Sequence, residues 1–398
     1  MLPTKWPKTP IESLCIRVTS GGTPSRSNPA YYDGGTIPWI KTGELRGWYV
    51  DAISERITPA AVKESSAKVF PAETVLLAMY GDGRTMGSVG LTRAPAATNQ
   101  ACCAMLTNPE HCVPKFLMYA LMHYKPALLK LAISGAQRNL SGKSIKEFEI
   151  GAPPVEVQHR IASILSAYDD LIENNTRRIA ILEEMARRLY EEWFVRFRFP
   201  GHEGVRMVES ELGLVPQGWD VVRLDQVLVL QRGFDLPKQD RIEGRFSIVS
   251  STGSNATHHE CRVKGPGVVT GRSGSLGVVM YVEDDFWPLN TTLWVKQFIV
   301  GSPLYAFFVL RSIDLAGFNS GSAVPTLNRN DIHGLPVVRP SPELLARFDD
   351  VVGPILSLKE RLVLKNANLR TTRDLLLPKL ISGELDVFTL PEPLAETV

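Results

Sequence analysis

Two glycine-rich loops carry side chains of the types that contact nucleic acids. The first, residues 80–85 (YGDGRT), offers Arg84 beside the hydroxyl of Thr85. The second, residues 271–275 (GRSGS), offers Arg272 between glycines and serines. An arginine can bind both acceptor atoms of a guanine edge, and hydroxyls can contact bases or phosphates. These loops are therefore candidate DNA contacts, and the alternative is that each is a tight hairpin without a ligand.

Basic residues are concentrated near the same loops. Residues 125–146 contain five lysines or arginines and no acid, and residues 241–272 contain five against two. Clustered cationic side chains neutralise phosphates, so both stretches favour contact with a polyanion. An ordinary solvated surface is the alternative, because the net charge of the whole chain is only +2.

The sequence makes no comparable case for catalysis or for a metal. There is no Asn-Pro-Pro-aromatic tetrapeptide, no G-x-S-x-G turn and no H-E-x-x-H pair. Residues 141–144 (SGKS) resemble a phosphate loop, but the glycine that such a loop needs is replaced by Gln137. Residues 258–261 (HHEC) lack a second ligand cluster at zinc spacing. We therefore expect a non-catalytic chain with no metal and no cofactor of its own.

Length and composition set the class of protein. The chain has 398 residues, of which 44% are hydrophobic and 22% charged, which predicts two or three globular domains. The five cysteines contain no C-x-x-C pair, so free thiols in a reducing cytoplasm are expected. No secretory signal and no apolar run of membrane-spanning length is visible, and no membrane partner is expected.

An internal duplication organises these features. Trp6 matches Trp219 at a separation of 213 residues, and Leu140 matches Leu327 at a separation of 187. Between them, residues 41–43 (KTG) match 251–253 (STG), and Asn99 falls near Asn290. The separation between matched residues decreases from 213 to 187 along the module and then stays constant. The second copy is therefore shorter by about 26 residues, and the missing residues belong to its first part.

Each copy is predicted to contain a mixed α/β module followed by one long helix. The modules span residues 1–152 and 206–340, with buried strands at 75–79 and 267–270 and helices at 116–131 and 304–315. The long helices span residues 153–200 and 341–385, and residues 386–398 form a tail.

The long helices carry apolar residues at alternating spacings of four and three. This spacing predicts a coiled-coil seam, in which two helices of one chain can lie antiparallel. Pro354 should bend the second helix, and Lys359 and Arg373 make its seam poorer. The seam positions assigned to helix pairing are Ile161, Leu165, Ile172, Asn175, Ile179, Leu182, Leu189, Leu362, Asn366, Leu369 and Leu376.

Two asparagines within the seam and the charges outside it have separate interpretations. Asn175 and Asn366 can fix helix register, or each can simply point to solvent. Arginines and glutamates alternate along residues 177–192, which indicates a solvated face or a partner-docking face rather than a DNA-binding stripe.

Several segments resemble type I restriction–modification specificity subunits in content and in order. The resemblance runs over essentially the whole chain, but the second copy lacks the Pro-Pro-x-Glu-x-Gln pattern and has Pro325 near the place of Gln137. The matching segments are residues 37–45 (IPWIKTGEL), 78–81 (AMYG), 98–101 (TNQA), 135–140 (GAQRNL), 153–158 (PPVEVQ) and 212–219 (LGLVPQGW).

The resemblance implies two target-recognition domains separated by two long antiparallel helices with pseudo-twofold symmetry. Each domain would read half of a bipartite, non-palindromic site in double-stranded DNA. The helices would dock two methyltransferase subunits, which carry S-adenosylmethionine, and translocase/nuclease subunits would join for restriction. Two alternatives are a stand-alone DNA-modifying enzyme and an interaction scaffold that binds no DNA. The proposed DNA contacts are Lys41, Thr42, Tyr80, Arg84, Thr85, Arg138, Lys143, Ser251, Arg272 and Ser275.

Overall fold

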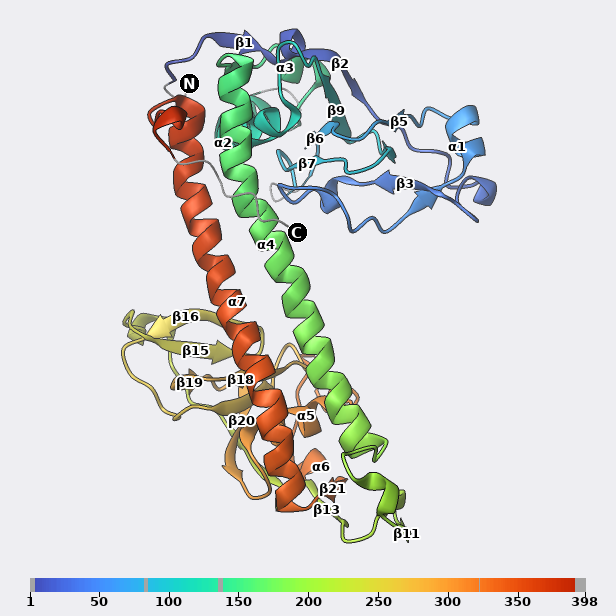
Figure 1. The fold of residues 1–398 in the computed structure, drawn as a ribbon, viewed down its shortest axis with the longest axis vertical. Helices are drawn as coiled ribbons and strands as arrows, with labels where there is room; N and C mark the ends of the chain where they lie inside the picture. Colours follow the sequence, from blue (N-terminus) through green and yellow to red (C-terminus); the bar gives the residue numbers. More distant parts are fainter. Residues whose placement is uncertain (1–3, 82–84, 135–138, 322, 391–398) are drawn as a thin grey trace. The chain divides into compact units, whose positions relative to one another are not determined.

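The chain divides into two compact units in a computed structural model. The structure describes residues 4–81, 85–134, 139–321 and 323–390. Unit 1 comprises residues 1–176 and 364–398, and unit 2 comprises residues 177–363. Each unit therefore contains one α/β module and one half of each long helix (Figure 1). No helix in the described ranges is both long enough and apolar enough to cross a membrane.

Unit 1 is built on two four-stranded sheets. The first is antiparallel, in the order β2 (Cys15–Ser20), β9 (Cys102–Thr107), β6 (Val75–Ala78) and β7 (Val89–Leu91). The second has the order β4 (Arg56–Ile57), β3 (Ile37–Ile40), β8 (Ala96–Thr98) and β5 (Val69–Phe70), with β3 and β8 parallel. The remaining elements are the antiparallel pair β1 (Lys8–Pro10) and β10 (Glu149–Gly151) and the helices α1 (Pro59–Glu64), α2 (Pro114–Ser134) and α3 (Gly142–Lys146).

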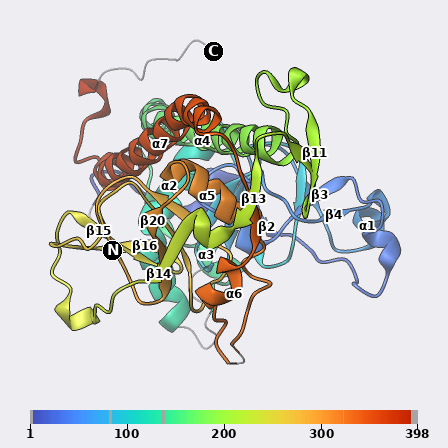
Figure 2. The same cartoon turned by 90° about the horizontal axis from the view of Figure 1, so that it is seen from below.

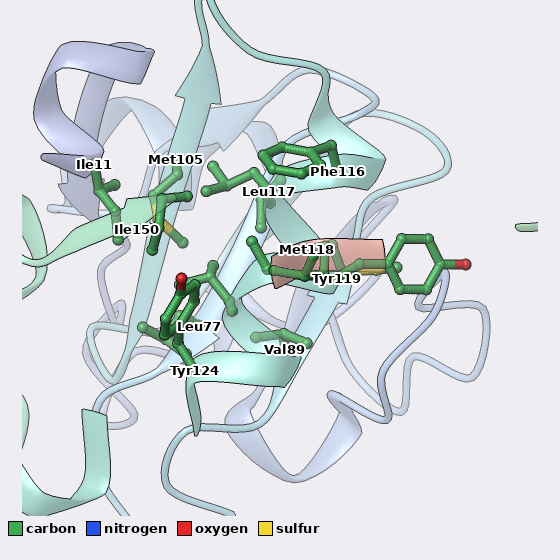
Figure 3. Packing of buried hydrophobic residues seen from close by; sticks show 14 of the residues in the cluster. Ile11, Leu77, Val89, Met105, Phe116, Leu117, Met118, Tyr119, Tyr124 and Ile150 are labelled. Atoms are coloured by element: carbon green, nitrogen blue, oxygen red, sulfur yellow. The ribbon is translucent and has the colours of Figure 1, made fainter. Parts of the chain in front are cut away.

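Helix α2 covers the first sheet of unit 1 and completes its core. Phe116 and Leu117 gather with Leu77, Val89 and other buried side chains of the sheet (Figure 3). Burying such side chains contributes roughly 1.5–3 kcal/mol each, so this core is what holds the loops of the module in place.

Unit 2 repeats this plan, with one strand fewer in its second sheet. Its antiparallel sheet has the order β14 (Leu228–Arg232), β20 (Thr292–Phe298), β17 (Gly267–Gly271) and β18 (Val279–Val282). Its second sheet has the order β16 (Gly253–His258), β15 (Phe246–Ser250) and β19 (Phe286–Pro288), with β15 and β19 parallel. The remaining elements are the pair β13 (Asp220–Arg223) and β21 (Pro336–Arg339), the hairpin β11 (Met207–Ser210) and β12 (Gly213–Pro216), and the helices α5 (Pro303–Ser312) and α6 (Arg329–His333).

The duplication is confirmed by strand order and by equivalent backbone hydrogen bonds. The separation between matched residues is 213 at the start of the modules and 187 at their end, as predicted. Three bonds of unit 1 recur in unit 2: Ile11 N to Phe148 O as Leu224 N to Leu335 O, Gly22 N to Thr98 O as Phe234 N to Pro288 O, and Leu140 N to Met79 O as Leu327 N to Arg272 O.

These bonds also correct two of the predicted matches by one residue. Asn99 N bonds to Ile40 O as Leu289 N bonds to Val249 O, so Asn99 matches Leu289. Gln100 is therefore the residue that matches Asn290. By the same bonds Thr42, rather than Lys41, matches Ser251. Deletions in the connecting loops shift the alignment of the two copies at these positions. Matching of residue types alone does not detect a shift of one residue.

The long helices α4 (Val155–Tyr190) and α7 (Pro342–Ser382) are shorter than the predicted spans. Helix α4 passes at Glu191–Val195 into one π-helical turn, where Trp193 and Phe194 enter the core of unit 2. Helix α7 ends before Gly383, whose φ of 77° is the left-handed conformation that commonly stops a helix. It continues as one helix through Pro354, and the two helices lie side by side in both views (Figures 1 and 2).

Candidate nucleic-acid interface

The predicted contact loops of unit 1 emerge from neighbouring strand ends. The end of β3 is joined to the segment after β8 by the bond from Asn99 N to Ile40 O, at 3.0 Å. The end of β6 is joined to the same segment by the bond from Met79 N to Ala101 O, at 2.8 Å. The residues after β3 and after β6, which include Lys41 and Tyr80, therefore start from one edge of the module.

Lys41 is part of an ion cluster that the sequence did not predict. Its Nζ lies 3.0 Å from Glu55 Oε1, and Arg26 Nη2 lies 2.7 Å from Glu55 Oε2. The hydrogen bond from Lys41 holds the pKa of the Glu55 carboxyl below its usual value. Arg26 also lies over the ring of Tyr32, with its guanidinium carbon 4.5 Å from the ring centre. Arg26 is the more exposed of the two cations, so it joins Lys41 as a candidate phosphate contact.

The loop after β6 presents one exposed aromatic ring. Tyr80 is 43% exposed, whereas Thr85 is only partly exposed. The bond from Leu140 N to Met79 O, at 3.0 Å, places α3 next to this loop. Lys143 on α3 is largely exposed and lies 3.8 Å from Glu147, a surface pair that contributes little. Arg84 and Arg138 lie outside the residues that the structure describes.

A side-chain amide occupies the same position in both units. In unit 1, Thr23 Oγ1 donates to Gln100 Oε1. In unit 2, Asn290 Nδ2 donates to Asp235 Oδ1 at the matching positions. Gln100 is exposed and Asn290 is partly exposed. Glutamine and asparagine side chains can bind both edge atoms of adenine, which makes this pair the clearest candidate for reading bases.

The predicted residues of unit 2 lie around this amide. Arg272 donates from its backbone N to Thr291 O at 2.8 Å and from Nη1 to Asn290 O at 3.2 Å. Ser275 is partly exposed in the same loop. Ser251 is only 6% exposed, so its side chain is less available to a ligand than expected.

Close backbone contact fixes the residues that precede Thr23. A Cβ on Gly21 would lie 2.1 Å from Thr98 O, and one on Gly233 would lie 2.2 Å from Leu289 O. We expect Gly21→Ala to lower the free energy of unfolding by about 1–3 kcal/mol, because the strands must separate. Thermal unfolding with Gly43→Ala as control, where a Cβ meets nothing within 4 Å, checks this. Equal stability of the two variants would contradict the prediction.

Of the residues predicted to pair the helices, Asn175 on α4 and Asn366 on α7 are in direct contact. Within unit 1, Asn175 Nδ2 donates to Asn366 Oδ1 at 2.9 Å, and both side chains are 2% exposed. Neither asparagine therefore points to solvent. In unit 2, Lys359 on α7 lies 3.4 Å from Glu183 on α4, so the order of contacts is antiparallel. The assigned seam positions are all buried or partly buried: Ile161, Leu165, Ile172, Ile179, Leu182, Leu189, Leu362, Leu369 and Leu376.

A buried polar contact joins three helices of unit 1. Tyr119 on α2, whose ring points away from the other labelled core side chains in Figure 3, donates to Asp169 Oδ2 on α4 at 2.6 Å. Arg373 on α7 forms an ion pair with the other oxygen of Asp169. The Asp169 side chain is 4% exposed, and burial raises the pKa of its carboxyl. Arg373 is thus a partner for a buried carboxylate rather than a flaw in the seam.

Charged side chains outside the seam of α4 pair along the helix itself. Glu184 contacts Arg187 and Arg188 on α4, and Glu192 in the following π-helical turn contacts Arg196, at 2.5–2.9 Å. Exposed pairs of this spacing contribute a few tenths of a kcal/mol each. Their mutual neutralisation is typical of a solvated face.

The remaining candidate ligands are few in the described ranges. His258, His259 and Glu260 could bring ligand atoms within 4.8 Å of one another. However, Nδ1 of His258 lies 3.2 Å from the backbone of Ile242. The five cysteines are free, and burial raises the pKa of the Cys102, Cys103 and Cys112 thiols, which keeps them protonated.

Known proteins resemble this chain in sequence and in fold. Residues 3–184 match the model of the type I restriction modification DNA specificity domain. A type I restriction enzyme MjaIX specificity subunit from Methanocaldococcus jannaschii is 28% identical over 97% of this chain and 95% of its own length. Over nearly its whole length the chain is similar to type I restriction enzyme specificity subunits.

Two further proteins, one known by sequence and one by structure, are also similar to this chain. The EcoR124I/EcoR124II specificity subunit of Escherichia coli is 28% identical over 46% of both chains. The S subunit structure from M. genitalium has a TM-score of 0.65, covers 96% of this chain and 99% of its own, and is 18% identical, which supports the fold alone. The family model ends at residue 184, and the duplicated backbone hydrogen bonds extend the same architecture to unit 2.

Proposed function

We propose that this chain is the DNA-recognition subunit of a type I restriction–modification complex. Each unit reads one half of a bipartite site in double-stranded DNA, and the target is non-palindromic. One observation carries the proposal: two copies of one scaffold present different side chains at equivalent loop positions, with Gln100 against Asn290 and Tyr80 against Ser273. A shared backbone with different edge groups is suited to reading two different half-sites.

The long helices supply the spacing between the two reading surfaces. Helix α4 alone, with 36 residues, is about 54 Å long at 1.5 Å per residue. One turn of duplex DNA is about 34 Å, so half-sites rather more than one turn apart fit a spacer of this length. Methyltransferase subunits, two per chain, dock on the helix pair.

The chemistry belongs to the partner subunits. This chain is non-catalytic, and S-adenosylmethionine is held by the methyltransferase subunits. Translocase/nuclease subunits join the complex for restriction. This division agrees with a sequence that lacks the motifs of methyl transfer and of nucleotide binding.

Mapping methylated adenines across the genome tests the proposal. We expect deletion of this chain to abolish methylation at one two-part motif, and we expect re-expression to restore it. The purified chain alone should methylate and cleave nothing. An unchanged methylation map, or methylation by the isolated chain, would show that another function is correct.

A further inference from the structure

The outer edge of the first sheet is covered in unit 1. Residues 47–50 run parallel to β7, with Tyr49 bridged to Leu91. Gly47 N donates to Val89 O at 2.8 Å, Leu91 N donates to Trp48 O at 3.1 Å, and Val50 N donates to Leu91 O at 3.0 Å. All three residues of β7 are buried as a result.

The covering segment is anchored by the indole of Trp48. Its Nε1 donates to Glu173 Oε2 on α4 at 3.0 Å. The ring lies 6.2 Å from Tyr119 on α2, and Lys115 Nζ lies 5.3 Å from the ring centre. Residues 47–50 thus form a short added strand with an aromatic anchor between two helices.

In the part of the chain that the structure describes, no added strand covers the equivalent edge in unit 2. In unit 1 the covering segment belongs to the long connection between β3 and β4, residues 41–55. In unit 2 only Ser251 and Thr252 connect β15 to β16, so there is no segment of this connection to cover β18. All four residues of β18 are partly exposed, and in the described ranges no backbone bond joins Tyr281 to a segment outside its sheet.

A cleft of about 390 Å³ lies beside this edge, within the range of roughly 300–1,000 Å³ typical of ligand sites. Its apolar wall comes from β18, α5 and α7, and its polar rim comes from α4, α5 and α7. The lining residues are Glu183, Gly277, Val278, Val279, Met280, Tyr281, Phe307, Arg311, Leu356, Lys359 and Glu360.

The duplication places this cleft where the anchor lies in unit 1. The strand registers match Val89 with Val279 and Leu91 with Tyr281. The separation of 187 that holds at the module ends matches Glu173 with Glu360. The acceptor of the Trp48 indole therefore has a carboxylate equivalent at the rim of the cleft.

We propose that the edge of β18 binds an extended segment of a partner protein that carries an aromatic side chain. The segment adds to the sheet as a parallel strand, with bonds to Val279 O, Tyr281 N and Tyr281 O. Its aromatic side chain enters the cleft, and an indole donates to Glu360. An open strand edge supplies main-chain bonds for such pairing, and the adjacent cleft supplies selectivity. This binding does not depend on DNA recognition.

A peptide with the sequence of residues 45–51 (LRGWYVD) is the direct probe, because this sequence covers the edge in unit 1. We expect the fluorescently labelled peptide to bind the full chain by polarisation. Replacement of its tryptophan by alanine should weaken binding at least about ten-fold, as for an aromatic anchor. A photoreactive phenylalanine at that position should crosslink to residues 277–281 or to Phe307.

Matched variants separate strand addition from unspecific adhesion. N-methylation at the peptide positions of Gly47 and Val50 removes the two donors and should abolish binding, whereas N-methylation at Tyr49 should leave it unchanged. Glu360→Ala should weaken binding about ten-fold, and Glu343→Ala, on the same helix outside the cleft, should not. Absence of binding, indifference to the tryptophan, or crosslinks elsewhere would overturn the proposal.

Discussion

Arg373→Ala will lower the free energy of unfolding of unit 1 by about 3–5 kcal/mol. The change removes the cation that is paired with Asp169 and leaves the carboxylate buried, with Tyr119 as its only donor among the residues that the structure describes. Removing one member of a buried ion pair costs this much because the remaining charge stays desolvated. Chemical denaturation followed by hydrogen exchange in α2 and α4 measures the loss and assigns it to unit 1.

Unit 2 provides the control for this experiment. At a separation of 187 residues, Asp169 matches Leu356 and Arg373 matches Ala186, and from the prolines that begin α2 and α5 Tyr119 matches Phe308. All three matching residues belong to the apolar core of unit 2. The triple variant Tyr119→Phe, Asp169→Leu and Arg373→Ala should therefore be about as stable as the original chain, since apolar replacement of a whole buried pair is often neutral. A triple variant as unstable as Arg373→Ala would show that the loss came from packing and not from the unpaired charge.

The pH dependence of Arg373→Ala provides a second test of the same cause. Burial already raises the pKa of Asp169, and the variant loses the opposing effect of the arginine. A carboxyl whose pKa is higher folded than unfolded binds its proton more readily in the folded state, so folding gains stability as pH falls. The deficit of the variant should therefore narrow from pH 7 to about pH 5. A constant deficit over this range would rule out the buried carboxylate as its source.

The sequence predicted the elements of this chain better than their connections. The sequence separation between matched residues was enough to find the duplication. Strand order and register keep this separation even where residue types change. The heptad pattern also assigned Asn175 and Asn366, which are in contact, to the helix seam, because burial on one helix face imposes that spacing. Both long helices were predicted to end several residues too late. Their observed ends are set by aromatic packing after Tyr190 and by the left-handed conformation of Gly383.

Contacts between loops could not be predicted in the same way. The pairing of Thr23 with Gln100 depends on a one-residue register that only the backbone bonds reveal. The ion pair between Arg373 and Asp169 joins residues on different helices, and the seam pattern shows only that Arg373 is a polar seam residue. The length of the connection after β3 or β15 determines whether the outer edge of the first sheet of that unit is covered. A comparison of residue types shows that this connection is shorter in unit 2, but not where its missing residues would have packed.

The matched amides lead to the second large effect, a loss of recognition confined to one half-site. Gln100→Ala should weaken binding of the complex to DNA by about 1–3 kcal/mol, or roughly 5- to 150-fold, through one half-site. Asn290→Ala should do the same through the other half-site. The reason is that each amide can make two hydrogen bonds to an adenine edge, and alanine makes none.

Binding assays on two sets of duplexes measure these effects, one set altered in each half-site. For Gln100→Ala, base changes in one half-site should lose their penalty while those in the other keep it, and Asn290→Ala should give the converse pattern. Thr23→Val, which removes only the hydroxyl bonded to Gln100, should weaken the same half-site less than Gln100→Ala does, because the amide remains. A uniform loss on every duplex would instead assign these residues to phosphate contact, since phosphate contacts are independent of base sequence.

Asn99→Ala is a further variant that discriminates, because the backbone bonds make Gln100, rather than its neighbour Asn99, the equivalent of Asn290. If Asn99→Ala, and not Gln100→Ala, removed the penalty for base changes in that half-site, the assignment of equivalent positions would be wrong.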